Sequence, residues 1–203
     1  MDLSVLGLSN LTYSELILVV PGEENNVNVA PVGVKLFDGV LRINLYRRTQ
    51  SYRLLKMARE CTLNVVWDPK VFYNSVMNLD VKVELVENFK IPIVRGADAS
   101  IEAVVTWIVE GDPAHFFLKP RQVWVKKVYP RAFNRATPAI IEALVHYTRI
   151  KPYLAMGLIG EARRLVSRIA YCVDTVMHAT EDVVLRVLAI DILRRSMFLL
   201  GLT

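Results

Sequence analysis

The chain carries at residues 34–45 the stretch VKLFDGVLRINL, which decides how its first half folds. Two runs rich in apolar side chains flank the pair Asp38-Gly39. A two-residue Asp-Gly connection is typical of a tight hairpin, because glycine tolerates the positive φ that such a turn demands. The stretch therefore predicts two antiparallel strands, residues 27–37 and 40–45, joined by this turn.

Further strands are expected on both sides of the hairpin. An apolar run at residues 15–20 ends at Pro21-Gly22, and Asn25-Asn26 supplies turn chemistry before the hairpin. Downstream, alternating or β-branched stretches predict strands at residues 62–67, 81–87, 100–109 and 123–129. The first two thirds of the chain are thus expected to be mainly β.

Two short helices are expected between these strands. Residues 50–60 carry apolar side chains at helical spacing, and Thr49 or Ser51 is placed to cap their start. Asp68-Pro69 predicts a second helix start, with aspartate as the cap and proline at the first helical position.

The last third of the chain has the periodicity of helices, at residues 134–150, 159–179 and 181–200. Pro138 stands near the start of the first, and Thr180 is the expected cap of the third. Apolar stripes are expected to pack against the barrel or one another, at Leu165, Ile169, Val173 and Val176, then Val184, Leu188, Ile192 and Leu199. We expect a β domain at 1–130 and a helical region at 131–203.

The composition narrows the class of protein. Hydrophobic residues make up 53% of the 203 residues and the mean hydropathy is +0.32, so either the core is large or apolar surface is covered by a partner chain. We find no uncharged apolar run of about 18 residues, which predicts a soluble, cytoplasmic protein. The two cysteines, Cys61 and Cys172, and the isolated histidines His115, His146 and His178 do not have metal-ligand spacing. We therefore expect no metal site.

A candidate anion site follows the second hairpin strand, at residues 46–52. The strand ends in Arg47 and Arg48, and hydroxyl side chains lead directly into the predicted helix. Free N–H groups at a helix start, the helix dipole and arginine all favour a phosphate. The alternative is that the two arginines are a solvated surface pair.

Pro31 is the second unusual feature, because proline inside a strand removes one ladder donor. The residue is expected at a sheet edge, at a bulge, or where the backbone faces a ligand such as a flat heterocycle. The simpler alternative is that it protects an edge strand.

At these residues the chain resembles an archaeal family of unknown function, the flavin-reductase-like FMN-binding split-barrel proteins. The matching pieces lie in the same order along the chain. They are residues 28–34 (NVAPVGV), 51–53 (SYR), 61–66 (CTLNVV) with Asp68-Pro69 and Phe72-Tyr73, and Asn134-Arg135 with 141–149 (IEALVHYTR).

The resemblance implies a fold that is mainly β with a helical extension (α+β), a six-stranded antiparallel Greek-key split β-barrel followed by C-terminal helices, and a homodimer with FMN at the subunit interface. It places the phosphate on Arg48, Thr49, Ser51 and Tyr52. It places the isoalloxazine along Asn28, Val29, Ala30 and Pro31, and the full set of expected cofactor-binding residues also includes Tyr46 and Arg47.

The chain departs from the family pattern at two places. Arg47-Arg48 stands where the family often has a small residue and a hydroxyl, which is expected to strengthen phosphate binding. Trp67 stands where a second aspartate is common, so the loop beside it is not predicted.

Two other groups of side chains have competing interpretations. Glu142, His146 and Arg149 share a helical face and could line a flavin pocket or form a salt-bridged solvent face. Trp67, Trp107 and Trp124 could stack on single-stranded nucleic acid, and the net charge of +5 is compatible with this, but core or interface positions are the commoner use of such aromatics.

The leading functional hypothesis is an FMN-dependent oxidoreductase that takes hydride from NADH or NADPH. The alternatives are a non-catalytic flavin carrier and a nucleic-acid-binding β-barrel. The sequence contains no nucleophile elbow, dinucleotide loop or P-loop, which fits a flavoprotein because the cofactor carries the redox chemistry.

Overall fold

The computed structural model describes residues 2–8, 10, 13–23, 26–126 and 135–202. The chain forms two compact units, residues 1–67 with 79–129, and residues 68–78 with 130–203. Each unit is described by itself. The division into a β domain and a helical region at residue 130 stays a prediction.

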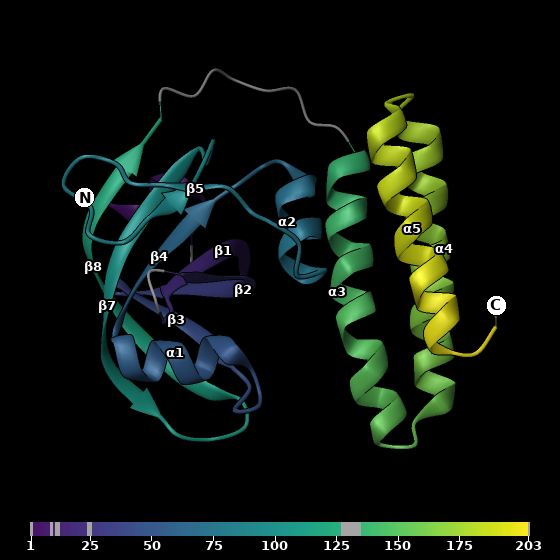
Figure 1. The fold of residues 1–203 in the computed structure, drawn as a ribbon, viewed down its shortest axis with the longest axis horizontal. Helices are drawn as coiled ribbons and strands as arrows, with labels where there is room; N and C mark the ends of the chain where they lie inside the picture. The colour runs from purple at the N-terminus through teal and green to yellow at the C-terminus, as the bar shows by residue number, and fades with distance from the viewer. Residues whose placement is uncertain (1, 9, 11–12, 24–25, 127–134, 203) are drawn as a thin grey trace. The chain divides into compact units, whose positions relative to one another are not determined.

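The first unit contains the predicted barrel. Its six strands are β1 (Ser14–Pro21), β2 (Val27–Phe37), β3 (Val40–Leu45), β4 (Glu60–Val65), β7 (Ala99–Val109) and β8 (Ala114–Val125). They pair antiparallel in the closed order β1-β2-β3-β8-β7-β4 (Figure 1). Alternate side chains point inward and form the core, for example Leu41, Ile43 and Phe116, all fully buried. The predicted fold class is therefore confirmed.

The β2–β3 hairpin at Asp38-Gly39 has the geometry that the sequence predicts. Phe37 pairs with Val40, and Asp38 and Gly39 have φ angles of 46° and 80°. Positive φ at both turn residues matches the right-handed twist of the flanking strands.

The helix α1 (Gln50–Ala58) follows β3 and begins at residue 50 as predicted, and Thr49 is the cap of the two residues that the sequence offered, Thr49 and Ser51. It ends at Ala58 rather than at Glu60, because Arg59 adopts a left-handed conformation with φ of 62° and closes the last turn. Glu60 is thereby free to begin β4.

Three of the predicted strands have other bounds. The last barrel strand begins at Ala114, nine residues before the predicted start at 123, and residues 127–129 of the prediction lie outside the described residues. The unpredicted first part of β8 contains Pro120. Proline is tolerated at this position because β3 pairs with β8 only as far as Leu118. Residues 81–87 hold only the short β5 (Val83–Glu84), which pairs with β6 (Ile93–Val94) in a separate two-stranded sheet. The third, β4, ends two residues before Trp67.

Asn64, within one of the family-like stretches, is a buried structural residue of the barrel. Its Oδ1 accepts hydrogen bonds from the Val94 N–H (3.0 Å) and the Ser100 hydroxyl (2.8 Å). Its Nδ2 donates to the Ile17 carbonyl at 3.0 Å. Satisfying a buried amide in this way fixes the β6 segment to β4 and β1.

The second unit consists of α2 (Pro69–Val76), α3 (Ala136–Ala155), α4 (Ile159–Ala179) and α5 (Val183–Leu199) (Figure 1). Asp68 caps α2 as predicted, accepting from the Lys70 N–H. In sequence α2 lies between β4 and β5, so a segment of the second unit is inserted into the sequence of the first. Tyr73 of α2 donates its hydroxyl proton to Asp191 of α5, which ties the two helices together.

Several helix predictions need correction. Asp182, not Thr180, caps α5, accepting from the N–H groups of Val184 and Leu185, while Thr180 ends α4. The predicted first helix residue, 134, lies outside the described residues, and α3 runs past 150 to Ala155. Leu165, Ile169 and Val176 of the predicted α4 stripe are buried, and Val173 is half-buried. Of the predicted α5 stripe, Ile192 is buried, Leu188 and Leu199 are half-buried, and Val184 is exposed. Ala189 and Ser196 complete the buried side of α5.

Candidate functional site

An unpaired edge of β2 lies at the residues predicted to face a ring. Residues 27–33 pair with β1, and Pro31 lies opposite Ile17, but the ladder with β3 begins only at Val34. On the side away from β1, residues 28–31 therefore have no strand partner among the described residues. The expected edge position of Pro31 is confirmed, and the backbone groups beside it are available to a ligand.

The predicted anion site is built by the loop between β3 and α1. The Thr49 hydroxyl accepts from the Tyr52 N–H at 3.3 Å and donates to the Tyr46 carbonyl at 2.8 Å. The helix start leaves further N–H groups without intrahelical partners, and its first turn contains no acidic residue. This loop keeps the positive end of the helix dipole free for an anion.

One hydrogen bond joins the edge to the anion site. Asn28 Nδ2, on β2, donates to Ser51 Oγ, on α1, at 2.8 Å. Ser51 is buried, and its own hydroxyl proton is left to donate. The two segments predicted separately from the sequence are thus in direct contact.

The two arginines have different environments. Arg47 Nη2 lies 3.1 Å from Glu110 Oε2, and the backbone N–H of Arg47 donates to Asp112 Oδ1 at 3.1 Å. The Arg48 guanidinium lies over the exposed Tyr46 ring at 5.8 Å. Arg47 is therefore held by the β7–β8 turn, whereas Arg48 is the arginine better placed to bind a phosphate.

Glu110 is a site neighbour that sequence reasoning missed. It accepts from Lys56 Nζ at 2.7 Å and from the Tyr52 hydroxyl at 3.0 Å, as well as from Arg47. The hydrogen bonds from Lys56 and Tyr52 lower the pKa of Glu110, and the bond to Glu110 raises the pKa of Lys56. The Tyr52 ring is buried with its edge toward Phe116. Tyr52 therefore anchors the helix, and its hydroxyl is already used by Glu110.

A cavity of about 500 Å³ lies beside the Asn28–Ser51 contact. Residues of the β1–β2 connection and one face of α1 line it: Gly22, Glu23, Asn26, Val27, Asn28, Gln50, Arg53, Leu54 and Met57. Its size is that of a typical small-molecule site. The helical spacing of positions 50, 53, 54 and 57 could have identified these residues from the sequence.

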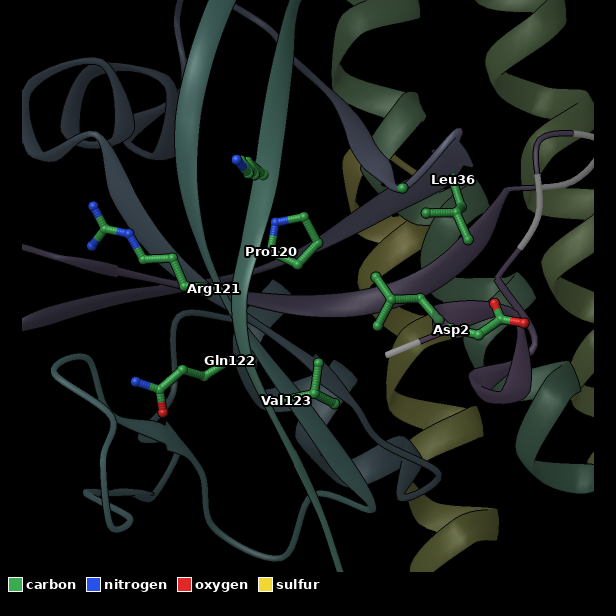
Figure 2. A pocket seen from close by; sticks show the side chains of 9 residues that line it. Asp2, Leu36, Pro120, Arg121, Gln122 and Val123 are labelled. Carbon is green, nitrogen blue, oxygen red and sulfur yellow. The ribbon is translucent and has the colours of Figure 1, made fainter.

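A second hollow, of about 360 Å³, is shown in Figure 2. It is lined by Asp2, Leu36 and residues 119–123 of β8, and it includes none of the predicted flavin residues. Arg121 is paired there with Glu60 at 3.0 Å. The hollow is therefore a weaker candidate for the site.

The other polar group predicted from the sequence is only partly assembled. His146 is buried in the helical unit and lies 3.2 Å from Glu142 Oε1, whereas Arg149 is exposed. Burial lowers the pKa of His146, and the nearby charges of Arg168 and Arg149 act in the same direction, against Glu142. The burial of His146 and its contact with Glu142 favour a structural role for this pair.

Among the described residues, no ring contact joins two of the three tryptophans. Trp107 stacks on Phe117 with ring centres 4.1 Å apart, and Trp67 is exposed two residues beyond the end of β4. No helix in the described part of the chain is long and apolar enough to span a membrane.

Known proteins share this fold. The chain is similar to an FMN-bound protein of the DUF447 family from Methanosarcina mazei. The similarity covers 96% of this chain and 100% of that protein, at 22% identity and a TM-score of 0.78. The chain is also similar over 63% of its length, at 14% identity and a TM-score of 0.50, to 88% of the styrene monooxygenase flavin reductase of Pseudomonas putida. At these identities the similarities establish the fold.

The family follows from a separate match. Residues 14–145 match the family model described as the N-terminal domain of a protein of unknown function, DUF447. This range covers the whole barrel and the first part of α3. The chain therefore belongs to the DUF447 family.

Proposed function

We propose that this protein binds FMN and acts as an FMN-dependent oxidoreductase that accepts hydride from NADH or NADPH. The observation that carries the proposal is the 2.8 Å contact between Asn28 and Ser51, because it joins an unpaired sheet edge to an anion site. FMN has a flat ring with polar edges and a dianionic phosphate, so it needs both features together.

The residues fit the two ends of this cofactor. Arg48, the Thr49 loop and the Ser51 hydroxyl would hold the phosphate, with the α1 start supplying N–H donors. Backbone groups at Asn28, Val29, Ala30 and Pro31 would meet the ring. Bound FMN would supply the redox chemistry at its ring, and the protein would supply binding and orientation. The FMN-bound Methanosarcina relative and the Pseudomonas flavin reductase support this assignment.

We further propose that the active form is a homodimer with both subunits contributing to the flavin pocket. Exposed apolar side chains support a covered surface, among them Tyr46 in the anion loop, Trp107 on β7, and Val183, Val187 and Phe198 on α5. A monomer that keeps full FMN affinity at micromolar concentration in sedimentation experiments would contradict this.

Titration of the flavin-free protein with FMN and with riboflavin tests the binding site. FMN should bind much more tightly, since riboflavin lacks the phosphate. Equal affinity would contradict the anion site, and binding of neither flavin would contradict the proposed function.

Anaerobic addition of NADH or NADPH to the FMN-loaded protein then tests catalysis. Bleaching of the flavin absorbance supports an oxidoreductase, and unchanged absorbance with both nucleotides favours the alternative, a flavin carrier. Binding of single-stranded nucleic acid without flavin would favour the third hypothesis.

A further inference from the structure

A polar cluster on the outer face of the barrel has no part in the contacts described above. It consists of Tyr13, which immediately precedes β1, with Lys35 on β2, Arg42 and Asn44 on β3, and His115 on β8. The register aligns Lys35 with Arg42 and Asn44 with His115, so these side chains share one face of the sheet.

The Tyr13 ring lies on bare backbone at Gly33. A Cβ atom built on Gly33 would come within 3.2 Å of Tyr13 Cδ1, so glycine allows this close approach. Gly33 is also the residue at which β2 ceases to pair with β3. The ring therefore lies at the fork where the free edge of β2 begins.

Two donors hold the Tyr13 hydroxyl. Arg42 Nη2 donates to it at 2.9 Å and Asn44 Nδ2 at 3.2 Å. Asn44 Oδ1 in turn lies 2.7 Å from His115 Nδ1, which fixes the amide orientation if Nδ1 carries the proton. Because the phenol oxygen accepts both bonds, its own proton is left to donate, and with 46% of the residue exposed that proton can reach a ligand.

The charges around Tyr13 favour loss of this proton. Lys35 Nζ lies 4.6 Å from the ring centre. Burial acts to raise the pKa of Tyr13, but the bonds from Asn44 and Arg42 and the charges of Arg42 and Lys35 outweigh it and lower the pKa. Glu15, an exposed carboxylate two residues along the chain, has an interaction of its own.

The position of the hydroxyl relates it to both parts of the proposed flavin site. Gly33 is two residues from Pro31 on the same face of β2, a separation of about 6.6 Å. Asn44 is two residues before Tyr46, where the anion loop begins. Aromatic rings flank the cluster, with Phe37 4.9 Å from the Arg42 guanidinium and Phe117 paired with Arg42. A flat molecule placed against a flavin on the β2 edge would have Tyr13 as a neighbouring hydrogen-bond donor.

We propose that Tyr13 donates a proton to the carbonyl oxygen of a flat electron acceptor of the quinone class, a role that rests on the proposed flavin function. Reduced FMN would supply two electrons and one proton. Tyr13 gives the second proton to the quinone oxygen as its C=O double bond becomes a single bond, and the product is the hydroquinone. Arg42 and Asn44 stabilise the phenolate that remains, and solvent returns its proton. His115 positions Asn44.

The test compares Tyr13→Phe, which keeps the ring over Gly33, with Tyr171→Phe, which removes the hydroxyl of an exposed tyrosine of α4. In the flavin-free protein, ultraviolet absorbance should show a tyrosine that ionises below the usual pKa of about 10. That ionisation should be lost in Tyr13→Phe and kept in Tyr171→Phe. If the tyrosine that Tyr13→Phe removes instead ionises with the ordinary pKa of about 10, the proposal is overturned.

Stopped-flow reoxidation of the photoreduced FMN-loaded protein supplies the second measurement. Duroquinone needs protons, whereas ferricyanide takes single electrons without a proton. Tyr13→Phe should slow the reaction with duroquinone by about 10²-fold, a typical effect of losing a general acid, and leave the reaction with ferricyanide unchanged. Equal rates with duroquinone in wild type and Tyr13→Phe would overturn only the role of Tyr13. Failure of the wild type to bind FMN would overturn the proposed function and this proposal with it.

Discussion

The polar side chains of the barrel unit and of the helical unit are used differently. Around the free edge of β2, Ser51 and Tyr13 each accept hydrogen bonds and keep a proton to donate. In the helical unit, Asp191 accepts from Tyr73, Arg194 and Arg195 together, so its oxygens are already bonded within the fold. Groups with spare donors bind ligands, and groups that bond one another stabilise structure. This difference supports the proposal that the barrel binds the cofactor and the helices contribute stability.

The largest expected effect is a loss of stability after substitutions in the cores of the two units. Phe116→Ala in the barrel should lower the free energy of unfolding by about 3–5 kcal/mol, because it leaves a cavity at a fully buried ring. Ile169→Ala in α4 should cost about 2–5 kcal/mol for the same reason. Urea unfolding followed by circular dichroism measures both. Under conditions in which both variants stay folded, only Phe116→Ala should weaken FMN binding. An equal loss of FMN affinity in both variants would contradict the difference between the two units.

The second prediction concerns the two arginines of the anion loop. Arg48→Ala should remove a charged hydrogen bond to phosphate worth about 1.5–3 kcal/mol, and so weaken FMN binding about ten- to a hundredfold. Arg47→Ala should weaken it less, because Arg47 is already paired with Glu110. Fluorescence titration with riboflavin is the control, and its affinity should stay unchanged in both variants. A larger loss of FMN affinity in Arg47→Ala than in Arg48→Ala would place the phosphate nearer to the β7–β8 turn.

A smaller effect is expected for the link between α2 and α5. Tyr73→Phe should lower the free energy of unfolding by about 1.5 kcal/mol, because it removes a donor to a partly buried carboxylate. Tyr171→Phe, on an exposed position of α4, should change it by less than about 0.5 kcal/mol. Thermal unfolding measures both changes, and FMN affinity should not move in either variant. Loss of FMN binding in Tyr73→Phe would assign the helices a part in the flavin site.

The smallest effect is a pH dependence from His146. Its Nδ1 is buried without a hydrogen-bond partner among the described residues, so protonation would add an unsatisfied buried N–H. Because burial lowers the pKa of His146 below the ordinary 6.5, the unfolded chain binds the proton more readily. Stability should therefore be unaffected well above pH 6.5 and should fall as the pH is lowered through that value. His146→Gln should flatten this part of the profile, and an unchanged profile would assign the pH dependence to another group.

Local signals in the sequence were sufficient for much of the barrel. Asp38-Gly39 specifies its turn through backbone φ, and Thr49 and Asp68 specify helix starts through side chains that reach N–H groups within three residues. These interactions lie within a few residues of one another, so their chemistry is visible in the order of residues. The early part of β8 was not predicted, and it contains Pro120, which is tolerated because the ladder with β3 ends at Leu118, a feature of the tertiary structure.

The candidate site divides in the same way. The sequence by itself determined the residue types of an anion loop at 46–52 and an unusual proline at 31. Only the tertiary structure decided that Asn28 contacts Ser51 across 23 positions, that Glu110 engages Arg47 across 63, and that Tyr13 reaches Arg42 and Asn44. Such contacts depend on strand register and on where a helix crosses a sheet. Both are set by the packing of the whole core, which no local pattern of residues records.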